Sequence, residues 1–290
     1  MINILITESG GPAAVGLIKS IKQLPYKVTI VAVDMDELAV GNYLSDYHYQ
    51  VPKASDSNYI DNILNIINKH NIKLIIPTGE NDLQSLSKNI ELFKNIGCKL
   101  FISNLDTIKI CQNKFKFWEH LNKKFKMPLP LNGVFLKPDV GVGGRGTKKI
   151  EASKGSHLWE FLPGKEYTVD VFCDMNSNII NHVIRERIAI KSGISVKGKI
   201  ISNLDISFSV KKLVKHLDLK GPLCIQYKEN ELGEPFLIEC NPRLGGGTYM
   251  CTLAGINYAE IYFNLLRGVE NTTIDPKKIT VLRYYNEIII

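Results

Sequence analysis

The segment 237-LIECNPRLGGGT-248 places three polar side chains at every second position and then runs into three glycines. Because successive side chains of a β-strand point to opposite faces, Glu239, Asn241 and Arg243 are expected to share one face of a strand. Their apolar neighbours fall on the other face, as in a strand half buried against a core. The polar face is either an ordinary solvated surface or a place for chemistry, and the neighbouring sequence has to decide between them.

The preceding segment supplies a further polar side chain. Residues 224–240 contain two apolar runs joined by the turn-rich 228-KENELGEP-235, which predicts a β-hairpin. Antiparallel pairing would bring Gln226 beside Glu239 and Asn241. One carboxylate and two amide oxygens resemble a Mg²⁺ site that phosphate oxygens and water complete, because Mg²⁺ prefers hard oxygen ligands. Arg243, next along the same face, would meet the phosphate that the metal holds.

The composition is typical of a soluble globular protein. The 290 residues are enough for a substantial core in two or three structural units. Apolar residues make up 44% of the chain, and no stretch approaches the roughly 18 uninterrupted apolar residues of a membrane span. The opening MINILIT predicts a strand rather than a signal peptide. A cytoplasmic location without a membrane partner is therefore expected.

Charge and cysteine usage exclude several other classes. The six cysteines are scattered, with no CxxC pair and no zinc-like histidine spacing, so reduced and mostly buried thiols are expected. The formal net charge is +7, but the lysines lie in short, separate clusters and no DNA- or RNA-binding motif accompanies them. A solvated surface and a pocket for a polyanionic small molecule explain this charge better than a nucleic-acid partner.

Strand and helix patterns alternate over the first hundred residues, beginning with a βαβ unit around a glycine turn. A parallel sheet covered by helices is the economical fold for residues 1–106. The expected strands are 2–7, 27–34, 72–79 and 98–103. Residues 8–22 are expected to form a glycine turn and a helix, and further helices are expected over 59–71 and 81–97.

Two features lie at the ends of these strands. Asp34 ends the second strand, where the ribose-binding acid of a dinucleotide site would lie, but 8-ESGGPAAVG-16 lacks the GxGxxG order of that fingerprint. A scaffold that supplies part of a substrate pocket is favoured over a NAD site. The loop 77-PTGEND-82 also follows a strand, which makes Glu80 and Asp82 candidate ligand contacts. An exposed acidic loop is the alternative.

The pattern changes from about residue 107. Residues 105–131 read as one helix closed by two prolines, and strands predominate after it. Four glycines lie between the strand-like ends of 134-VFLKPDVGVGGRGTKKIE-151, without the GK[ST] ending or the following helix of a Walker P-loop. Such a hairpin can lie over phosphates, because glycine lets backbone N–H groups approach the anion, and Lys137 and Arg145 would add positive charge. A plain flexible turn is the alternative.

Together these motifs resemble the ATP-grasp superfamily, and more closely the branch that includes the large subunit of carbamoyl phosphate synthetase and related carboxylate–amine ligases. The resemblance spans nearly the whole chain in the family's order. Residues 4–21 and 31–52 look like the pre-ATP-grasp domain, 135–146 like the lysine-plus-glycine-loop element, 159–172 like the hinge that receives adenine, and 224–247 like the metal-binding hairpin.

The resemblance implies a fold that is α/β and α+β. A Rossmann-like pre-ATP-grasp domain with a parallel sheet would span residues 1–106, and a compact ATP-grasp domain of two α+β subdomains would span 107–290. Its lid subdomain would cover about 115–159 and its metal-binding subdomain about 160–290.

The resemblance also assigns roles to individual residues. Lys137 and Arg243 would be catalytic, with Arg243 stabilising the transferring phosphoryl group or the acyl phosphate. Mg²⁺ is expected, with two ions and with Mn²⁺ able to replace them, on Gln226, Glu239 and Asn241. The ATP contacts would be Lys114 and Lys137 on the phosphates, the backbone amides of Gly143, Gly144 and Gly146 over them, Glu160 and Leu162 at the adenine edge, mainly through backbone groups, and Glu166 at the ribose hydroxyls.

The substrate contacts are less clearly marked. The segment 185-RERIAIKSG-193 resembles the strand on which related ligases place a substrate-facing arginine. Alternation puts Arg185 and Arg187 on one face, and a surface ion-pair strand is the alternative. With Glu80, they are the substrate candidates.

The implied reaction joins a small-molecule carboxylate to an amine through an acyl phosphate, with release of ADP and phosphate. Both connections around the glycine loop, from Lys114 to Lys137 and from the loop to the hinge, look shorter than the family's usual ones, so either the lid is trimmed or some of its residues are absent from this sequence. Two alternatives remain open. One is a carboxylate kinase or a carbamoyl-phosphate-type enzyme that uses ammonia, and the other is a non-catalytic ATP-binding module. A homodimer is the default assembly.

Overall fold

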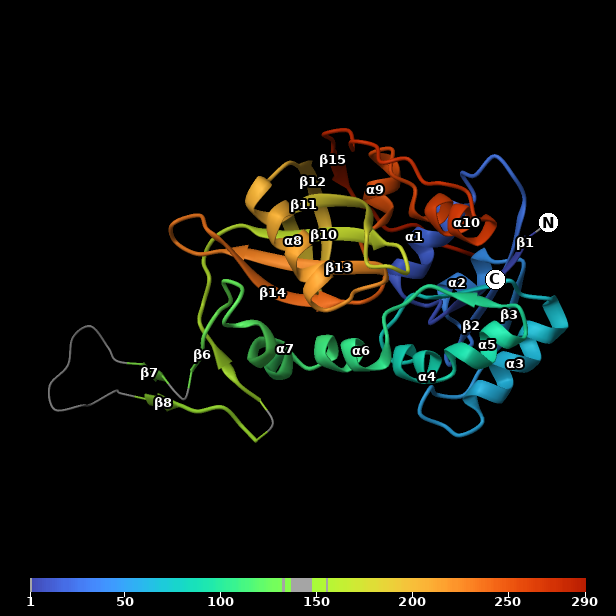
Figure 1. Cartoon of the computed structure of the whole chain (residues 1–290), viewed down its shortest axis with the longest axis horizontal. Coiled ribbons are helices and arrows are strands. Elements are labelled where there is room, and N and C mark those ends of the chain that lie inside the picture. Colours follow the sequence, from blue (N-terminus) through green and yellow to red (C-terminus); the bar gives the residue numbers. More distant parts are fainter. Residues whose placement is uncertain (1, 132–133, 137–147, 155) are drawn as a thin grey trace, which may run out of the picture.

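The chain begins with alternating strands and helices. This computed structural model describes residues 2–131, 134–136, 148–154 and 156–290 (Figure 1). The elements of its first part are β1 (Ile2–Thr7), α1 (Pro12–Ile21), β2 (Val28–Asp34), α2 (Val40–Leu44), β3 (Tyr47–Gln50), α3 (Tyr59–His70), β4 (Leu74–Pro77), α4 (Leu83–Lys88), α5 (Ile90–Asn95) and β5 (Lys99–Leu100). The five strands form one parallel sheet in the order β3-β2-β1-β4-β5, as the βαβ pattern predicts.

The second part of the chain carries longer strands. Its elements are α6 (Leu105–Gln112), α7 (Lys114–Leu121), β6 (Pro130–Leu131), β7 (Val134–Leu136), β8 (Lys148–Ile150), β9 (Leu158–Trp159), β10 (Glu166–Cys173), β11 (Ile179–Lys191), β12 (Ile194–Ile201), α8 (Leu204–His216), β13 (Gly221–Glu229), β14 (Pro235–Asn241), α9 (Tyr249–Leu253), α10 (Tyr258–Arg267) and β15 (Thr280–Leu282). Six strands form an antiparallel sheet in the order β14-β13-β10-β11-β12-β15. The predicted fold class, α/β followed by α+β, is confirmed.

The helix expected over 81–97 is wrong, because two short helices replace it. Asn89 leaves the helical conformation between α4 and α5, with φ −109° and ψ 16°. Its side chain donates a hydrogen bond to the Ser85 carbonyl at 2.8 Å, which offers the backbone a local alternative to helical hydrogen bonding. The strand expected over 98–103 is also shorter, since only Lys99–Leu100 pairs with β4.

The single helix expected over 105–131 is wrong as well. Asn113 is extended, with φ −113° and ψ 105°, and its side-chain oxygen accepts from the Lys116 amide at 2.9 Å. Asn113 therefore caps a new helix, α7, instead of continuing α6. The second helix ends at Leu121, well before the prolines at 128 and 130 that were expected to close it.

A shared apolar core joins the two sheets. Leu17 of α1 and Ile4 of β1 belong to the same buried cluster as Phe172 of β10 and Tyr262 and Phe263 of α10. Each side chain of this size contributes about 1.5–3 kcal/mol when it is fully buried. The loops of the parallel sheet are therefore held at a fixed place beside the antiparallel sheet, and α6 and α7 lead from the parallel half along the antiparallel sheet (Figure 1).

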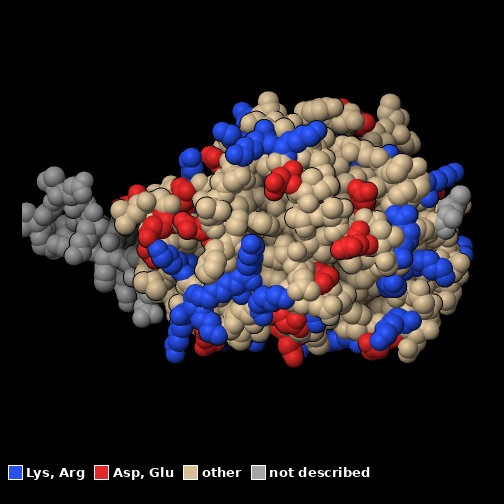
Figure 2. All heavy atoms as spheres, turned by 45° about the horizontal axis from the view of Figure 1, so that its top comes forward, with Lys and Arg blue, Asp and Glu red and all other residues tan. Residues whose placement is uncertain are grey.

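The surface carries both signs of charge. On the face shown in Figure 2, Lys and Arg side chains form separate groups with acidic side chains between them. Within the described part of the chain, none of the helices combines the length and the hydropathy that crossing a membrane requires.

Candidate active site

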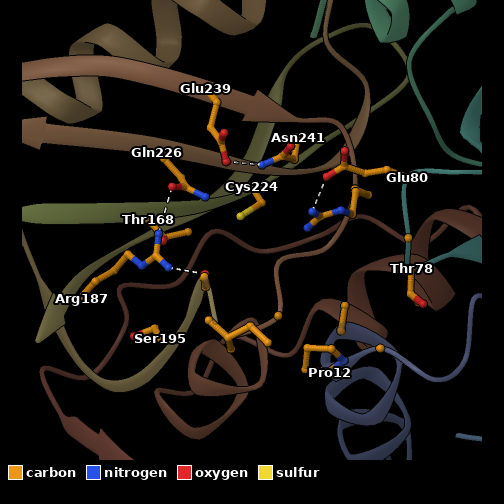
Figure 3. Close-up of a pocket in the computed structure, with 18 of the residues that line it drawn as sticks. Pro12, Thr78, Glu80, Thr168, Arg187, Ser195, Cys224, Gln226, Glu239 and Asn241 are labelled. Atoms are coloured by element: carbon orange, nitrogen blue, oxygen red, sulfur yellow. Dashed lines mark hydrogen bonds and ion pairs between the residues drawn. The ribbon is translucent and has the colours of Figure 1, made fainter. Parts of the chain in front are cut away.

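The hairpin of β13 and β14 brings three of the predicted metal ligands together. In its register Gln226 pairs with Glu239, and Cys224 pairs with Asn241. The side-chain amide of Asn241 donates to Glu239 Oε1 at 3.0 Å. Figure 3 shows Gln226, Glu239 and Asn241 reaching into one space from these neighbouring strands. The pairing expected from the sequence is present.

These side chains line a cavity of about 580 Å³, which we call the arginine pocket. Its far wall comes from the parallel half, where the loop after β1 and the start of α1 supply Gly11–Ala13 and the loop after β4 supplies Thr78–Glu80 (Figure 3). The antiparallel sheet and the segments next to it supply Lys114, Thr168, Arg185, Arg187, Ser195, Cys224, Gln226, Glu239, Asn241, Arg243, Gly246 and Gly247, among others. Both sheets therefore contribute to one site.

Each cation of the arginine pocket already has a carboxylate partner. Two of these pairs are partly exposed. Lys114 Nζ lies 3.4 Å from Glu239 Oε2, and Arg243 pairs with Glu80 across the pocket. The Lys114 side chain is 72% exposed, so the first pair can exchange its partners at little cost.

The other two cations, Arg185 and Arg187, have buried side chains. Arg185 Nε donates to Asp170 Oδ2 at 2.5 Å, with both side chains at most 2% exposed. Arg187 pairs with Glu166 and is 5% exposed. The reading of this strand as a surface ion-pair strand is therefore wrong, because the alternation placed both arginines on the inward face.

Asp170 binds two groups, the guanidinium of Arg185 and the end of the glycine segment 245–248. Its Oδ1 accepts from Thr248 Oγ1 at 2.6 Å, and its carbonyl accepts from the Tyr258 hydroxyl at 2.6 Å. Burial works against the Arg185 charge, but the Asp170 carboxylate outweighs it and raises the pKa of Arg185 above its ordinary value. A Cβ on Gly247 would come 2.6 Å from Arg185 Nη1, so the glycine lets the chain pass over the guanidinium.

Arg187 connects the predicted metal ligands to the predicted ribose ligand. Its Nη1 donates to Gln226 Oε1 at 3.0 Å and also pairs with Glu166 Oε1. Its buried Nε has no hydrogen-bond partner among the described residues. Glu166 is thus held behind Arg187, and it is not one of the described residues that line the arginine pocket.

A second cavity of about 300 Å³ adjoins the first, and we call it the tryptophan cavity. Lys114 lines both cavities. Trp118, Trp159, Leu162 and Ile238 give it an apolar lining, to which Met127, Pro128, Glu160, Phe161 and Lys228 are added.

The hinge residues of this cavity differ in what they can offer a ligand. The Glu160 amide already donates to the Leu129 carbonyl at 2.8 Å, and the Glu160 carboxylate accepts from the Leu129 amide at 3.1 Å. The buried Trp118 Nε1 has no partner among the described residues. Trp118 therefore offers a donor that sequence reasoning missed. The aromatic character of the cavity was visible in the sequence, since Trp159 and Phe161 flank Glu160.

Some of the predicted site residues lie outside the described residues, and some residues that line the cavities were not predicted. Lys137, Gly143, Gly144, Arg145 and Gly146 lie outside the described residues, while β7 and β8 on either side pair antiparallel as the two strand-like runs suggested. Thr168 was missed, although it stands two residues after Glu166 and pairs with Gln226.

Cys224 was also missed. Burial, with a further contribution from Asp170, raises the pKa of the Cys224 thiol to about 12. It remains a neutral thiol near neutral pH, so it is not suited to act as a nucleophile.

Two protein-family models match this chain. Residues 156–288 match the family described as "ATP-grasp in the biosynthetic pathway with Ter operon", and residues 4–101 match the "PylC-like, N-terminal domain". The fold is the ATP-grasp fold. Its antiparallel half contains the predicted metal ligands, and its parallel half supplies the far wall of the arginine pocket.

Known proteins agree with this assignment. The carbamoyl phosphate synthase large chain of Clostridium acetobutylicum is 24% identical over 296 residues, which cover 86% of this chain but only 27% of that protein. The chain thus spans about a quarter of the length of this curated relative.

Solved structures share the ATP-grasp fold over almost the whole chain. N5-carboxyaminoimidazole synthetase from Staphylococcus aureus, complexed with ADP, has a TM-score of 0.67 and 15% identity, covering 95% of this chain and 80% of that one. Biotin carboxylase from Campylobacter jejuni has a TM-score of 0.65 and 16% identity, covering 92% and 71%. The biotin carboxylase domain of the Hydrogenobacter thermophilus 2-oxoglutarate carboxylase, in complex with MgADP and bicarbonate, has a TM-score of 0.66 and 15% identity, covering 96% and 73%.

Proposed function

We propose that the protein is an ATP-dependent carboxylate–amine ligase that acts on small molecules and releases ADP and phosphate. The observation that carries this proposal is the position of Lys114, which lines both the tryptophan cavity and the arginine pocket. A nucleotide whose base fills the tryptophan cavity would place its phosphates at Lys114 and Glu239 in the arginine pocket. The division into a pre-ATP-grasp domain (1–106) and an ATP-grasp domain (107–290) is part of the proposal.

The tryptophan cavity suits a planar base. Its lining is aromatic and aliphatic, and Trp118 Nε1 is a buried donor for a ring nitrogen. Leu162 is buried in the wall, and its amide makes no hydrogen bond to a described residue. Because the Glu160 amide is occupied by Leu129, the Glu160 carbonyl and the Leu162 amide are the backbone groups we assign to the adenine edge.

Gln226, Glu239 and Asn241 form a fitting donor set for Mg²⁺, because all three offer hard oxygen ligands from neighbouring strands. The described residues contain no group of three or more His, Cys, Asp and Glu that would hold a metal ion. The single carboxylate of this set implies that ATP phosphates complete the coordination. When bound, Mg²⁺ would neutralise phosphate charge, and we propose two such ions with Mn²⁺ able to replace them.

The two partly exposed ion pairs would exchange partners when ATP binds. Lys114 would leave Glu239 for a phosphate oxygen, which frees Glu239 for Mg²⁺. Arg243 would turn from Glu80 toward the transferring phosphoryl group. The buried side chains of Arg185 and Arg187 would keep their partners and hold the wall of the site, with Arg187 also orienting Gln226.

The chemistry follows from this arrangement. A substrate carboxylate oxygen attacks the γ-phosphorus, and the bond to the β,γ-bridging oxygen breaks to release ADP. An amine nitrogen then attacks the acyl carbon, the C–O bond to phosphate breaks, and the nitrogen loses a proton. Arg243 and Lys114 balance the charge on the phosphoryl oxygens. The relatives support a small carboxylate substrate, since one neighbour is complexed with bicarbonate.

The test is release of ADP by the purified protein with ATP and Mg²⁺, against pools of small carboxylates with and without amines. Glu239→Ala should abolish release. Glu234→Ala, in the turn of the same hairpin and paired with the exposed Lys126, should leave it unchanged. ADP that requires both a carboxylate and an amine supports the ligase.

Other outcomes identify the alternatives. ADP that appears with a carboxylate alone, or with ammonia, indicates a carboxylate kinase or a carbamoyl-phosphate-type enzyme. ATP binding without turnover in every pool indicates a non-catalytic module. Size-exclusion chromatography with light scattering checks the proposed homodimer in the same preparation.

A further inference from the structure

A third cavity, of about 670 Å³, lies at the carboxyl ends of β1, β2 and β4 and is lined wholly by residues of the parallel half. We call it the acidic pocket. It shares Gly11, Thr78 and Gly79 with the arginine pocket, so the two cavities are neighbours across the loop after β4. Ligands of open α/β sheets bind at this edge of the sheet.

The acidic pocket has four carboxylates in its wall, Glu8, Asp34, Asp36 and Asp82, and Lys53 as its basic residue. Within the described ranges of the chain, none of these carboxylates forms an ion pair with a lysine or arginine. Their recorded partners are hydrogen-bond donors rather than cations. The cavity therefore attracts a cation.

Glu8 is held in place by neutral donors. Its Oε1 accepts from the Asn81 amide at 2.8 Å and from the Asp82 amide at 3.1 Å, and its Oε2 accepts from Asn81 Nδ2 at 2.8 Å. Its φ of 51° is unusual for a residue with a side chain. A Cβ on Gly79 would collide with the Glu8 carboxylate, so only glycine leaves room for it.

Asp82 has an oxygen without a partner. Asp82 is one of the residues that line the acidic pocket, and it is 1% exposed. Oδ2 accepts from the Tyr59 hydroxyl at 3.0 Å, but Oδ1 accepts no hydrogen bond from any residue that the structure describes. Burying a carboxylate oxygen in this way costs free energy that a bound cationic donor would recover.

The same wall disfavours a dinucleotide. The Gly10 amide donates to Asp34 Oδ2 at 2.8 Å, and the Gly11 amide donates to the Glu8 carbonyl at 3.4 Å. The amides that a phosphate would need are thus occupied, and the surrounding carboxylates would repel it.

We propose that the acidic pocket binds an ammonium group of the amine co-substrate, with Glu8 and Asp82 as its direct partners. This inference rests on the proposed ligase function. A nitrogen held among four carboxylates stays protonated, whereas the nitrogen that attacks an acyl phosphate must be neutral. The co-substrate therefore carries two basic nitrogens, one held in the acidic pocket and one that reaches past Gly79 into the arginine pocket. A diamine or a basic amino acid has this chemistry.

Binding tests the pocket without turnover. Isothermal titration calorimetry is run with the full-length protein and a panel of α,ω-diamines and basic amino acids. The matching monoamines serve as singly charged comparisons, and the matching diols serve as neutral ones. Diamines or basic amino acids should bind more tightly than monoamines, and diols should not bind. Glu8→Gln and Asp82→Asn should each weaken binding by about tenfold or more, as expected for the loss of a charge-assisted hydrogen bond. Asp61→Asn, an equal loss of charge on the exposed face of α3, should not.

Equal affinity in wild type and both pocket variants, or no binding by any amine of the panel, overturns the proposal. Circular dichroism and thermal melting confirm that each variant is folded. Because two isosteric variants are used, the failure of one to fold leaves the other to decide.

A kinetic arm separates this proposal from the function on which it rests. Hydroxylamine captures an acyl phosphate without a cationic anchor, so Glu8→Gln should keep hydroxylamine-dependent ADP release while its KM for the dibasic amine rises by about tenfold or more. If wild type releases no ADP with any carboxylate but still binds amines through Glu8, the ligase proposal fails and the ammonium site stands. If ADP release is normal and KM for the amine is unchanged in Glu8→Gln, the ammonium site fails alone.

Discussion

The arginine pocket and the acidic pocket share a wall but treat charge in opposite ways. In the arginine pocket every cationic side chain is paired with a carboxylate. In the acidic pocket the four carboxylates have no cationic partner among the described residues. The first site can exchange two of its ion pairs for ligands, and the second holds a cluster of acidic groups for which a ligand would supply the cationic partner.

The comparison extends to how firmly each pair is fixed. Arg185 is buried together with Asp170, and the Arg187 side chain is buried beside a partly exposed Glu166, whereas Lys114 and Arg243 are themselves partly exposed. Buried pairs resist exchange, because one partner alone would be left charged and desolvated. The arginine pocket therefore combines a rigid wall with two adjustable cations.

The largest expected effect comes from breaking the rigid wall. Arg185→Met leaves Asp170 charged and buried without its guanidinium, and should lower the free energy of unfolding by about 3–5 kcal/mol. Urea unfolding measures it. The exposed Lys126–Glu234 pair serves as the control, since Lys126→Ala should cost about 0–1 kcal/mol. A similar small loss for both variants would contradict the distinction between buried and exposed pairs.

Removing an adjustable cation should affect catalysis rather than stability. Arg243→Ala removes charge stabilisation at the transferring phosphoryl group, and kcat for carboxylate-dependent ADP release should fall by about 10²–10³-fold. The melting temperature should change little, because Arg243 and Glu80 are partly exposed. Arg243→Lys should recover only part of the rate, since lysine lacks the two-pronged geometry. Full activity in Arg243→Ala would refute the assigned role.

Lys114 should contribute chiefly to nucleotide binding. Lys114→Met removes one charge-assisted hydrogen bond to phosphate, which raises KM for ATP by about tenfold or more. Lys116→Met, on the same helix and exposed outside both cavities, is the matched control. Initial rates at varied ATP concentration measure the effect, and equal KM values in the two variants would place the phosphates elsewhere.

The acidic pocket should show itself in the pH dependence of stability. Burial, together with the nearby Glu8 charge, raises the pKa of Asp82 above its ordinary value, with Tyr59 and Asp34 as the other titratable groups nearby. The native state then binds a proton that the unfolded state has lost. Stability from this group is present at low pH and falls as the pH rises from roughly 4 toward 7, by at most about 1.4 kcal/mol per pH unit.

Asp82→Asn should remove that slope. Urea unfolding at roughly pH 5 and roughly pH 8 measures it, as the difference between wild type and variant. Asp61→Asn provides the control for a general change in net charge. A wild-type slope that persists in Asp82→Asn would assign the titration to another group.

The sequence predicted the strands and the hairpin well, because alternation and turn residues act locally. Period-two spacing placed Glu239 beside Asn241, and the turn length placed Gln226 opposite Glu239. The helix breaks were missed, because Asn89 and Asn113 each lie at a helix boundary where one side-chain hydrogen bond to the nearby backbone competes with the helix. A single asparagine carries no periodic signal.

The partners of the site residues were beyond local reasoning. Alternation indicated that Arg185 and Arg187 share a face, but their carboxylates come from β10, whose register against β11 is set by the whole sheet. Glu8 and Asn81 lie 73 positions apart and meet because β1 and β4 are parallel neighbours. Such contacts depend on the order of the strands in the sheet. The sequence indicated only the succession of strands and helices along the chain.

The buried cluster that links Leu17 of α1 to Tyr262 and Phe263 of α10 also limits how the chain can be engineered. Cutting the protein between the two regions that match family models would expose an apolar surface on each fragment. Both fragments would then tend to aggregate. Chimeras with related enzymes should carry α1 and α10 together as a single exchange unit. Swapping substrate preference is better attempted through the loops after β1 and β4, which reach the ligand cavities without belonging to that interface.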